Sequence, residues 1–265
     1  MPASAPALAA GPVRHIGRPV ESRPLRQELR HAAAAGHFAL LFQPRRALAD
    51  GALLGGEATL CWPRRRGGST SAGALMERLE ASGLVGPVVA RALRDACAAA
   101  ALWPEGLLSI AVAGASLEDG TLLGDVGAAL AESGLSPERL EIALGEPALA
   151  ADSTDALLTL AALRDLGVGV ALDGFGAESA SLLTLKRFPL TALKLDRSLV
   201  RDLPGDREAA AVVAAASFFA RALEVSVVAC GVETEAQRAL LCRIGCDAAQ
   251  GSLCGRPVAA VSWPP

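Results

Sequence analysis

Residues 154–173 of this 265-residue chain read TDALLTLAALRDLGVGVALD, and this stretch holds the unit that decides the fold. Its first part, residues 154–166, repeats apolar side chains at the spacing of an amphipathic helix. Gly167 follows, a residue type that commonly ends helices because it adopts a left-handed conformation without strain. A short apolar run then predicts a buried strand over residues 167–172. The stretch therefore predicts a helix, a tight turn and a strand in succession.

The same alternation extends in both directions along the chain. Further apolar runs predict strands over residues 38–44, 53–62, 107–113, 140–144, 192–195, 225–229 and, more weakly, 248–253. Helical periodicity covers residues 74–82, 87–101, 121–133, 179–187, 207–223 and 235–244, after a polar helical lead-in at 23–36. Most of these helices end at a glycine-containing turn, which is the usual stop signal.

Eight strands with helices between them predict a single-domain α/β fold, a closed (β/α)8 barrel of the TIM type, over residues 21–262. Residues 1–20 are predicted to form a flexible tail or linker. An open doubly wound sheet is the structural alternative. No G-x-G-x-x-G follows a strand and no G-x-x-x-x-G-K-[ST] occurs, so the sequence does not support a Rossmann or P-loop nucleotide site.

Composition excludes several classes of protein. Hydrophobic residues make up 52% and charged residues 20% of the chain, which excludes disorder over most of its length. The net charge of −3 provides no positive field for nucleic acid. The longest apolar run, residues 209–220, is shorter than the roughly 20 residues that a membrane span needs. Six cysteines without a C-x-x-C pair indicate reduced thiols, and we expect a cytoplasmic protein without a membrane span.

Polar residues near the ends of the predicted strands are the candidates for function, because barrel enzymes place their chemistry at the carboxyl ends of strands. They are Gln43, Glu57, Glu141, Asp173, Lys194, Asp196, Glu233 and Gln250. Three carboxylates that converge on one barrel mouth suggest a cation site, since buried charges must be paired or bound to metal. The alternative is that Lys194 and nearby arginines form salt bridges with them.

Several motifs, in order along residues 38–257, resemble the EAL domain, the bacterial family of cyclic di-GMP phosphodiesterases. They are Phe42-Gln43-Pro44, Gly56-Glu57-Ala58-Thr59-Leu60, Leu140-Glu141-Ile142, Leu193-Lys194-Leu195-Asp196-Arg197-Ser198, Gly231-Val232-Glu233-Thr234, and Gly245-Cys246-Asp247-Ala248-Ala249-Gln250-Gly251. The resemblance implies the barrel fold of this family and a place in cyclic di-GMP signalling. In such domains two divalent cations, usually Mg²⁺ or Mn²⁺, activate a water and hold a phosphate of the dinucleotide.

The resemblance also assigns roles to the residues that are retained. Glu57, Glu141 and Asp173 stand at metal-ligand positions and imply at most one weak, residual Mg²⁺ or Mn²⁺ site. Lys194 stands near the position of the nucleophile. The positions that match substrate contacts are Gln43, Lys194, Asp196, Glu233 and Gln250. We expect Lys194 to pair with the carboxylates, with partial protonation relieving the rest of their repulsion.

Departures from the family pattern fall on the catalytic positions, and no catalytic set is intact. Cys61 stands where a phosphate-binding arginine is expected, and the metal-ligand asparagine is absent from residues 112–116. Gly174 and Cys230 stand where carboxylates of the second metal site and the general base are expected. Leu144 replaces the glutamate that braces the loop after the strand of Asp173.

These losses predict a degenerate EAL domain, without firmly bound cofactor, that is a non-hydrolytic cyclic di-GMP effector or a protein-interaction module. Losing a general base alone costs about 10²–10⁴ in rate, and a thiol is a poor ligand for a hard cation such as Mg²⁺. A protein partner or a second copy of the chain would carry the output. The alternatives are a weakly active phosphodiesterase that releases linear pGpG, and a scaffold that binds no nucleotide.

Overall fold

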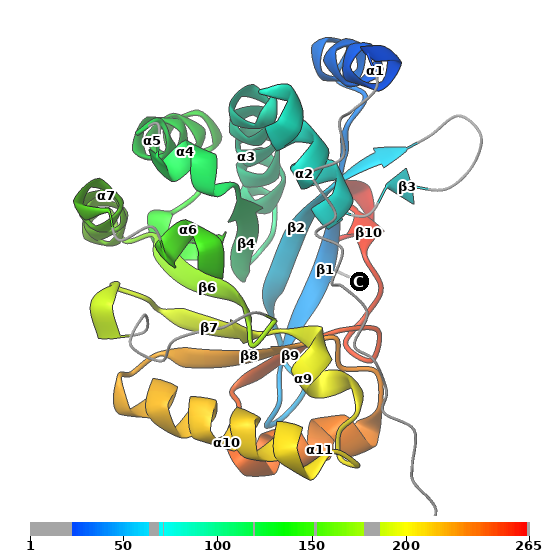
Figure 1. The fold of residues 1–265 in the computed structure, drawn as a ribbon, viewed down its shortest axis with the longest axis vertical. Coiled ribbons are helices and arrows are strands. Elements are labelled where there is room, and N and C mark those ends of the chain that lie inside the picture. The colour runs from blue at the N-terminus through cyan, green and yellow to red at the C-terminus, as the bar shows by residue number, and fades with distance from the viewer. Residues whose placement is uncertain are drawn as a thin grey trace, which may run out of the picture.

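The computed structural model describes residues 23–63, 69–70, 72–118, 120–150, 153–177 and 186–263. Eight of its strands close a barrel in the order β1-β2-β4-β5-β6-β7-β8-β9, and β9 pairs back with β1 (Figure 1). These strands are β1 (Ala39–Ala47), β2 (Leu53–Pro63), β4 (Leu107–Val112), β5 (Leu140–Gly145), β6 (Gly169–Phe175), β7 (Ala192–Leu195), β8 (Ser226–Cys230) and β9 (Ala248–Gln250). The predicted barrel and its eight strands are confirmed.

Strand β1 departs from a regular (β/α)8 barrel because it runs antiparallel to both β2 and β9. The connection between β1 and β2 is a short turn through Asp50 and Gly51. Such a turn can join only antiparallel strands, since a parallel pair needs a crossover of a dozen or more residues. The other neighbouring pairs in the barrel are parallel. Two short strands, β3 (Ser69–Thr70) and β10 (Val258–Ala259), extend the edges at β2 and β1.

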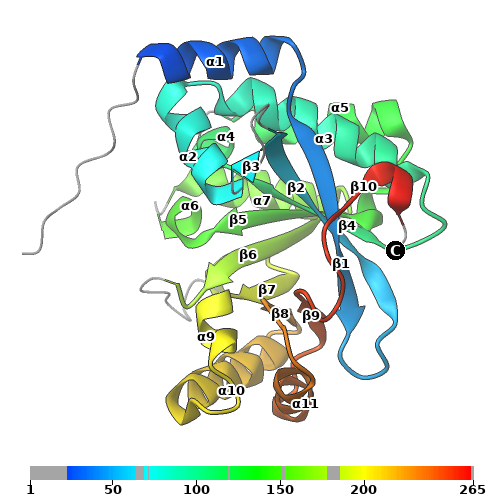
Figure 2. The ribbon, with the colours of Figure 1, turned by 90° about the vertical axis from the view of Figure 1, so that its right-hand side faces the viewer.

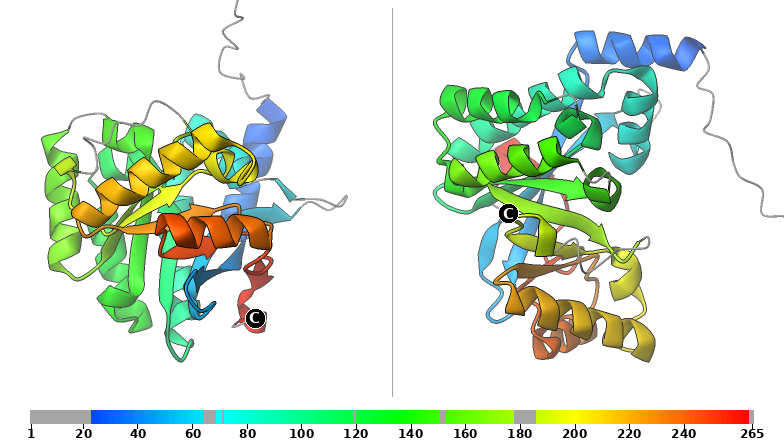
Figure 3. Two further views of the ribbon diagram at one scale, coloured as in Figure 1. Left: turned by 90° about the horizontal axis from the view of Figure 1, so that it is seen from below. Right: turned by 60° about the vertical axis from the view of Figure 1, so that its left-hand side comes forward.

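Helices cover the outside of the barrel. They are α2 (Ala72–Ser82), α3 (Val85–Ala101), α4 (Gly114–Glu118), α5 (Leu122–Ser133), α6 (Glu146–Ala150), α7 (Thr154–Asp165), α9 (Arg197–Arg201), α10 (Arg207–Ala222) and α11 (Glu235–Ile244), with α1 (Arg23–Ala34) before the first strand. Figure 2 shows α1 set apart from the barrel beside α2, and Figure 3 shows α10 and α11 together on one side. The predicted helix at 179–187 lies largely outside the described residues.

The two faces of the barrel strands carry different side chains. Since side chains alternate along a strand, Glu141 and Ala143 share a face of β5, and Ala192 and Lys194 share a face of β7. Ala143, Ala171 and Ala192 are register partners and form a small cluster of their own on this inner face. The larger aliphatic residues between them belong to the main core under the helices. The small inner residues leave room in the lumen for long polar side chains.

Gly55 allows β2 to approach β4 where the two strands begin to pair. Its φ of 142° lies in a region that residues with a Cβ rarely adopt. A Cβ at this position would lie 2.0 Å from the carbonyl oxygen of Leu107. The register of β2 and β4, and with it the position of Glu57, therefore depends on a glycine here.

In the parts of the chain that the structure describes, we find no helix with the length and apolar character that a bilayer crossing requires.

Candidate functional site

An ion pair between Arg45 and Glu141 spans the lumen of the barrel. Arg45 lies on β1 and Glu141 on β5, two strands that are not neighbours in the barrel. The guanidinium donates through Nη2 to Oε1 of Glu141 at 2.7 Å and through Nη1 to Oε2 at 3.3 Å. The side chains are only 5% and 4% exposed. Both carboxylate oxygens of Glu141 are therefore engaged by one buried cation.

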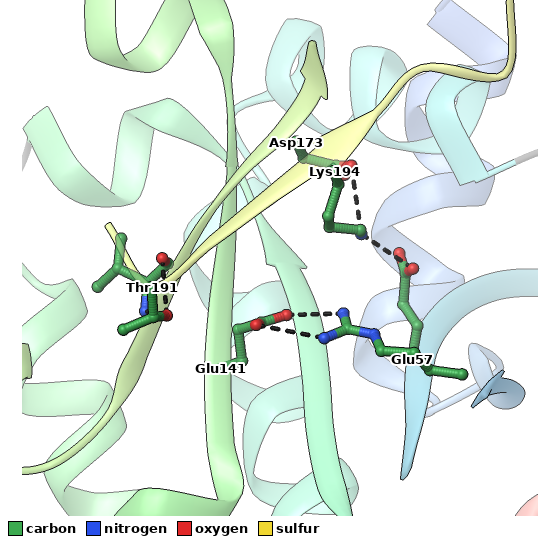
Figure 4. A network of polar contacts seen from close by, with 7 residues as sticks. Glu57, Glu141, Asp173, Thr191 and Lys194 are labelled. Carbon is green, nitrogen blue, oxygen red and sulfur yellow. Dashed lines mark hydrogen bonds and ion pairs between the residues drawn. The ribbon is translucent and has the colours of Figure 1, made fainter. Parts of the chain in front are cut away.

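Lys194 makes a second contact across the lumen, from β7 to β2 (Figure 4). Its Nζ lies 2.9 Å from Oε2 of Glu57 and 3.2 Å from Oδ1 of Asp173. The ammonium is 1% exposed, whereas the carboxylate side chains are 14% and 32% exposed. The predicted pairing with Lys194 is confirmed for Glu57 and Asp173, whereas Glu141 pairs with Arg45. We call these five residues the lumen cluster.

The charges of the lumen cluster keep its buried carboxylates ionised. Burial raises the pKa of the Glu57 carboxyl, but the charge of Lys194 and its hydrogen bond outweigh burial and hold the pKa below its ordinary value. Burial likewise raises the pKa of Glu141, and the charge and hydrogen bonds of Arg45 bring it below the ordinary range. The expectation of partial protonation is therefore wrong for Glu57 and Glu141, because two internal cations relieve their repulsion.

Gln43 and Gln250 join at the edge of the lumen cluster. Nε2 of Gln250 donates to Oε1 of Gln43 at 3.1 Å, and Nε2 of Gln43 donates to the carbonyl of Gly255 at 3.2 Å. Gln43 is the register partner of Glu57, so the glutamine pair adjoins the carboxylates. The side-chain oxygen of Gln250 is buried and accepts no hydrogen bond from the described residues. It is therefore a buried acceptor that no described residue satisfies.

Two predicted substrate-binding residues lie outside this group. Asp196 is the N-cap of α9, and its Oδ1 accepts a hydrogen bond from the backbone N–H of Ser198 at 2.8 Å. Glu233 follows β8 with an exposed side chain, and its backbone N–H donates to Oε1 of Gln237 at 2.8 Å. The binding roles of these two residues remain predictions.

We expect the side chain of Asp196 to stabilise the fold through its cap. Asp196→Ala should lower the free energy of unfolding by about 1 kcal/mol, whereas Asp196→Asn should leave it nearly unchanged, because asparagine caps as well as aspartate does. Urea denaturation of both variants measures the difference. An equal loss in the two variants would show that charge, and not the cap, stabilises this turn.

The substituted family positions do not supply ligands for a pair of divalent cations. Gly174 has a φ of 74° and no side chain, although a Cβ there would meet nothing within 4 Å. Burial raises the pKa of the Cys230 thiol to about 12, so this soft donor stays protonated. Among the described residues, no group of three or more histidine, cysteine, aspartate or glutamate side chains is arranged to hold a metal. The residues present therefore do not fit two Mg²⁺ or Mn²⁺ ions.

Burial also keeps neutral the thiol of Cys61, which stands where a phosphate-binding arginine is expected. Cys61 lies on β2, opposite Ala39, and burial raises the pKa of its thiol. A buried neutral thiol offers no positive charge to a phosphate. The departure at this position is therefore a loss of charge, as the sequence predicts.

Two residues of the site were missed by the sequence analysis. Arg45 was missed because the predicted first strand ends at Pro44, one residue before it. The signal that could have found it is its spacing: Arg45 lies two residues after Gln43 and therefore on the same face of an extended strand. Glu146 lies at the start of α6 and accepts a hydrogen bond from the backbone N–H of Gly176 at 3.1 Å. Leu144 cannot hold the loop after Asp173, but Glu146, two positions later in the chain, binds this loop from the start of α6.

Comparisons with known proteins agree with this geometry. A profile of the EAL domain matches residues 26–257. The chain is 34% identical over 245 residues to the bifunctional diguanylate cyclase/cyclic di-GMP phosphodiesterase MucR of Pseudomonas aeruginosa, covering 91% of this chain and 36% of MucR. A solved structure, the PaMucR phosphodiesterase in complex with c-di-GMP, superimposes with a TM-score of 0.85 at 33% identity, over 90% of this chain and 98% of that one.

A second solved structure is similar over most of its length. The FimX EAL domain of Xanthomonas citri in complex with c-diGMP gives a TM-score of 0.77 at 25% identity, covering 88% of this chain and 92% of that one. The chain spans about a third of the length of the curated relatives it matches first. The profile match, the shared barrel and the ordered motifs lead to one conclusion: this chain belongs to the EAL domain family.

Proposed function

We propose that this EAL domain takes part in cyclic di-GMP signalling by binding the dinucleotide at the barrel mouth without hydrolysing it. The mouth is the end of the lumen where the parallel strands finish, beside Asp173, Cys230 and Gln250. The observation that carries the proposal is the lumen cluster, in which each carboxylate is engaged by an internal cation.

The absence of hydrolysis follows from what the carboxylates can still do. A pair of metal ions would lower the pKa of a water and clamp the leaving oxygen. Glu141 has both oxygens on Arg45, and Glu57 and Asp173 share Lys194. Gly174 and Cys230 supply neither a hard oxygen ligand nor a general base. We therefore expect this chain to form no linear pGpG at a rate above background.

Binding is supported by polar groups around the mouth. The oxygen of Gln250 is buried and unsatisfied by the described residues, and a turn of this side chain toward the mouth on binding would let it accept a hydrogen bond from an N–H of guanine. Arg197 begins α9 directly after β7, is exposed, and stands beside Gly231 at the end of β8. Arg256 is exposed and follows Gly255, whose carbonyl binds Gln43. Two exposed guanidinium groups in this region suit the two phosphates of the ligand. The relatives MucR and FimX, described as complexes with c-di-GMP, support the same assignment.

Calorimetry with cyclic di-GMP, first in EDTA and then with Mn²⁺, together with chromatography for pGpG, tests the proposal. We expect binding heat in both buffers and no pGpG in either. Gln250→Leu should weaken binding by about fivefold, because one hydrogen bond contributes about 1 kcal/mol. Gln27→Leu, on the exposed surface of α1, is the matched control and should bind normally. Formation of pGpG would favour the weak phosphodiesterase, and folded protein that gives no heat would favour the scaffold.

A domain that binds the dinucleotide without hydrolysing it must pass the signal on through another molecule. We propose that this molecule is a protein partner or a second copy of the chain. The outer side of α10 supports it, because Phe218 is 77% exposed and Val212 is exposed on the same helix. Large apolar side chains that stay exposed in a folded chain are candidates for contact with a partner. Light scattering measures the mass of the purified chain with and without the dinucleotide. A doubled mass would indicate a second copy, and an unchanged mass would favour a different protein partner.

A further inference from the structure

We propose that Arg45 is a built-in cation that takes the place of a divalent ion at Glu141. Its guanidinium is covalently part of β1, so the positive charge that this buried carboxylate needs is supplied by the chain itself. The inference concerns metal binding and stands whether or not the chain binds cyclic di-GMP.

The contact between the two groups leaves Glu141 no free oxygen in the lumen. The carboxylate receives one hydrogen bond on each oxygen from a single planar group, at 2.7 Å and 3.3 Å. This two-point contact is the geometry in which arginine binds carboxylates most strongly and with the most defined orientation. A divalent cation at Glu141 would have to share both oxygens with the guanidinium and would compete with these hydrogen bonds.

Burial makes that exchange unfavourable. The side chain of Arg45 is only 5% exposed, and Glu141 is the one carboxylate among the described residues that pairs with it directly. A guanidinium displaced by a metal would remain in the lumen without a partner, and a buried charge without a partner is costly. Glu57 would have to serve both cations, because its Oε2 already binds Lys194.

The charge balance of the lumen cluster points the same way. Arg45 and Lys194 bring two positive charges against the carboxylates of Glu57, Glu141 and Asp173, which leaves one net negative charge. A divalent ion added to this set would reverse the sign of the cluster and would lie close to two buried cations. Repulsion between like charges is strong where water is excluded.

The surrounding strands accommodate the arginine. The inner face near Glu141 carries Ala143 and Ala171, whose small side chains leave space for a long one to cross from β1 to β5. Arg45 is a register partner of Gly55 on β2 and of Gln250 on β9, so its backbone is held on both sides. The guanidinium is thus positioned by the strands and not by the carboxylate alone.

The test is a comparison of melting temperatures of the full chain in EDTA and in about 1 mM MnCl₂. We expect Mn²⁺ to shift the wild-type melting temperature by less than about 1 °C. Arg45→Met should melt lower in EDTA, and Mn²⁺ should raise its melting temperature by at least about 5 °C if the opened site has a Kd of about 10 µM. Manganese EPR titration should show the gain in binding directly. Arg45→Gln, which is neutral but keeps a donor for Glu141, serves if the Met variant does not fold.

Two further variants locate the effect. Arg46→Met removes the adjacent arginine, which binds the backbone carbonyls of Gly51 and Cys254 and, within the described part of the chain, no carboxylate, so it should gain no response to Mn²⁺. Arg45→Met combined with Glu141→Leu should lose the response that Arg45→Met gained. The inference is overturned if wild-type protein responds to Mn²⁺ as strongly as Arg45→Met. It is equally overturned if neither Arg45 variant exceeds Arg46→Met, or if the double variant keeps the response.

Discussion

Lys194→Met should destabilise the chain by about 3–5 kcal/mol, the usual cost of removing one partner of a buried ion pair. For a chain of this size such a loss lowers the melting temperature by roughly 6–20 °C. Methionine preserves most of the volume of lysine, so the loss reports on charge more than on packing. Glu57 carries most of the effect, because it is more deeply buried than Asp173, which water can reach. Thermal unfolding monitored by circular dichroism measures the shift.

A second substitution separates the charge effect from general damage at this position. Combining Lys194→Met with Glu57→Gln removes the carboxylate that the first change leaves without a partner, so the double variant should be more stable than Lys194→Met alone. Arg91→Met is the surface control, because Arg91 pairs with Asp95 on the exposed side of α3 and such pairs contribute little. A double variant no more stable than the single one would show that the cost comes from packing in the lumen.

Gly55→Ala should be among the most damaging single-atom additions in the barrel, with a loss of at least about 4 kcal/mol, a size expected when the backbone around a substitution cannot adjust. The new Cβ would lie 2.0 Å from the oxygen and 2.4 Å from the nitrogen of Leu107, and both atoms belong to the backbone of the paired strand. The start of β2 and β4 must then separate. We expect a broad unfolding transition in urea, in place of a single steep one.

The turn between β1 and β2 provides the matched control. Gly51 also has a positive φ, 76°, but a Cβ there would meet nothing within 4 Å. Gly51→Ala therefore introduces only conformational strain, which costs about 1–2 kcal/mol. If Gly55→Ala were no worse than Gly51→Ala, the close approach of the two strands would not be a constraint on the fold.

The barrel was predictable because its strands are short apolar runs separated by helical periodicity. The limits of the prediction lie where local signals compete. Pro44 cannot donate a ladder hydrogen bond and reads as the end of a strand, yet β1 continues to Ala47. The helices α4, α6 and α9 have five residues each, too few to show a period. The number of strands predicts a barrel but not the direction of each strand. The antiparallel direction of β1 follows instead from the short turn that joins it to β2.

The candidate site was predictable in its carboxylates and less so in its cations. The family pattern led to Glu57, Asp173 and Lys194, which contact one another in the structure. It could not lead to Arg45, because the pattern marks the positions that relatives share and Arg45 lies outside the motifs. The contact from Arg45 to Glu141 is made across the barrel, between residues 96 apart in the chain. Only the closed fold brings them together.

The place of β1 between β2 and β9 has a consequence for how the chain acquires its structure during synthesis. Besides β2, this strand pairs with β9 (residues 248–250) and β10 (residues 258–259), which follow it in the chain by about 200 residues. A ribosome must therefore extend the chain past residue 259 before β1 gains its last neighbours, and until then the edge of β1 stays open to other chains. Premature termination shortly before Ala248 should leave an insoluble product, because β1 would then lack β9 and β10.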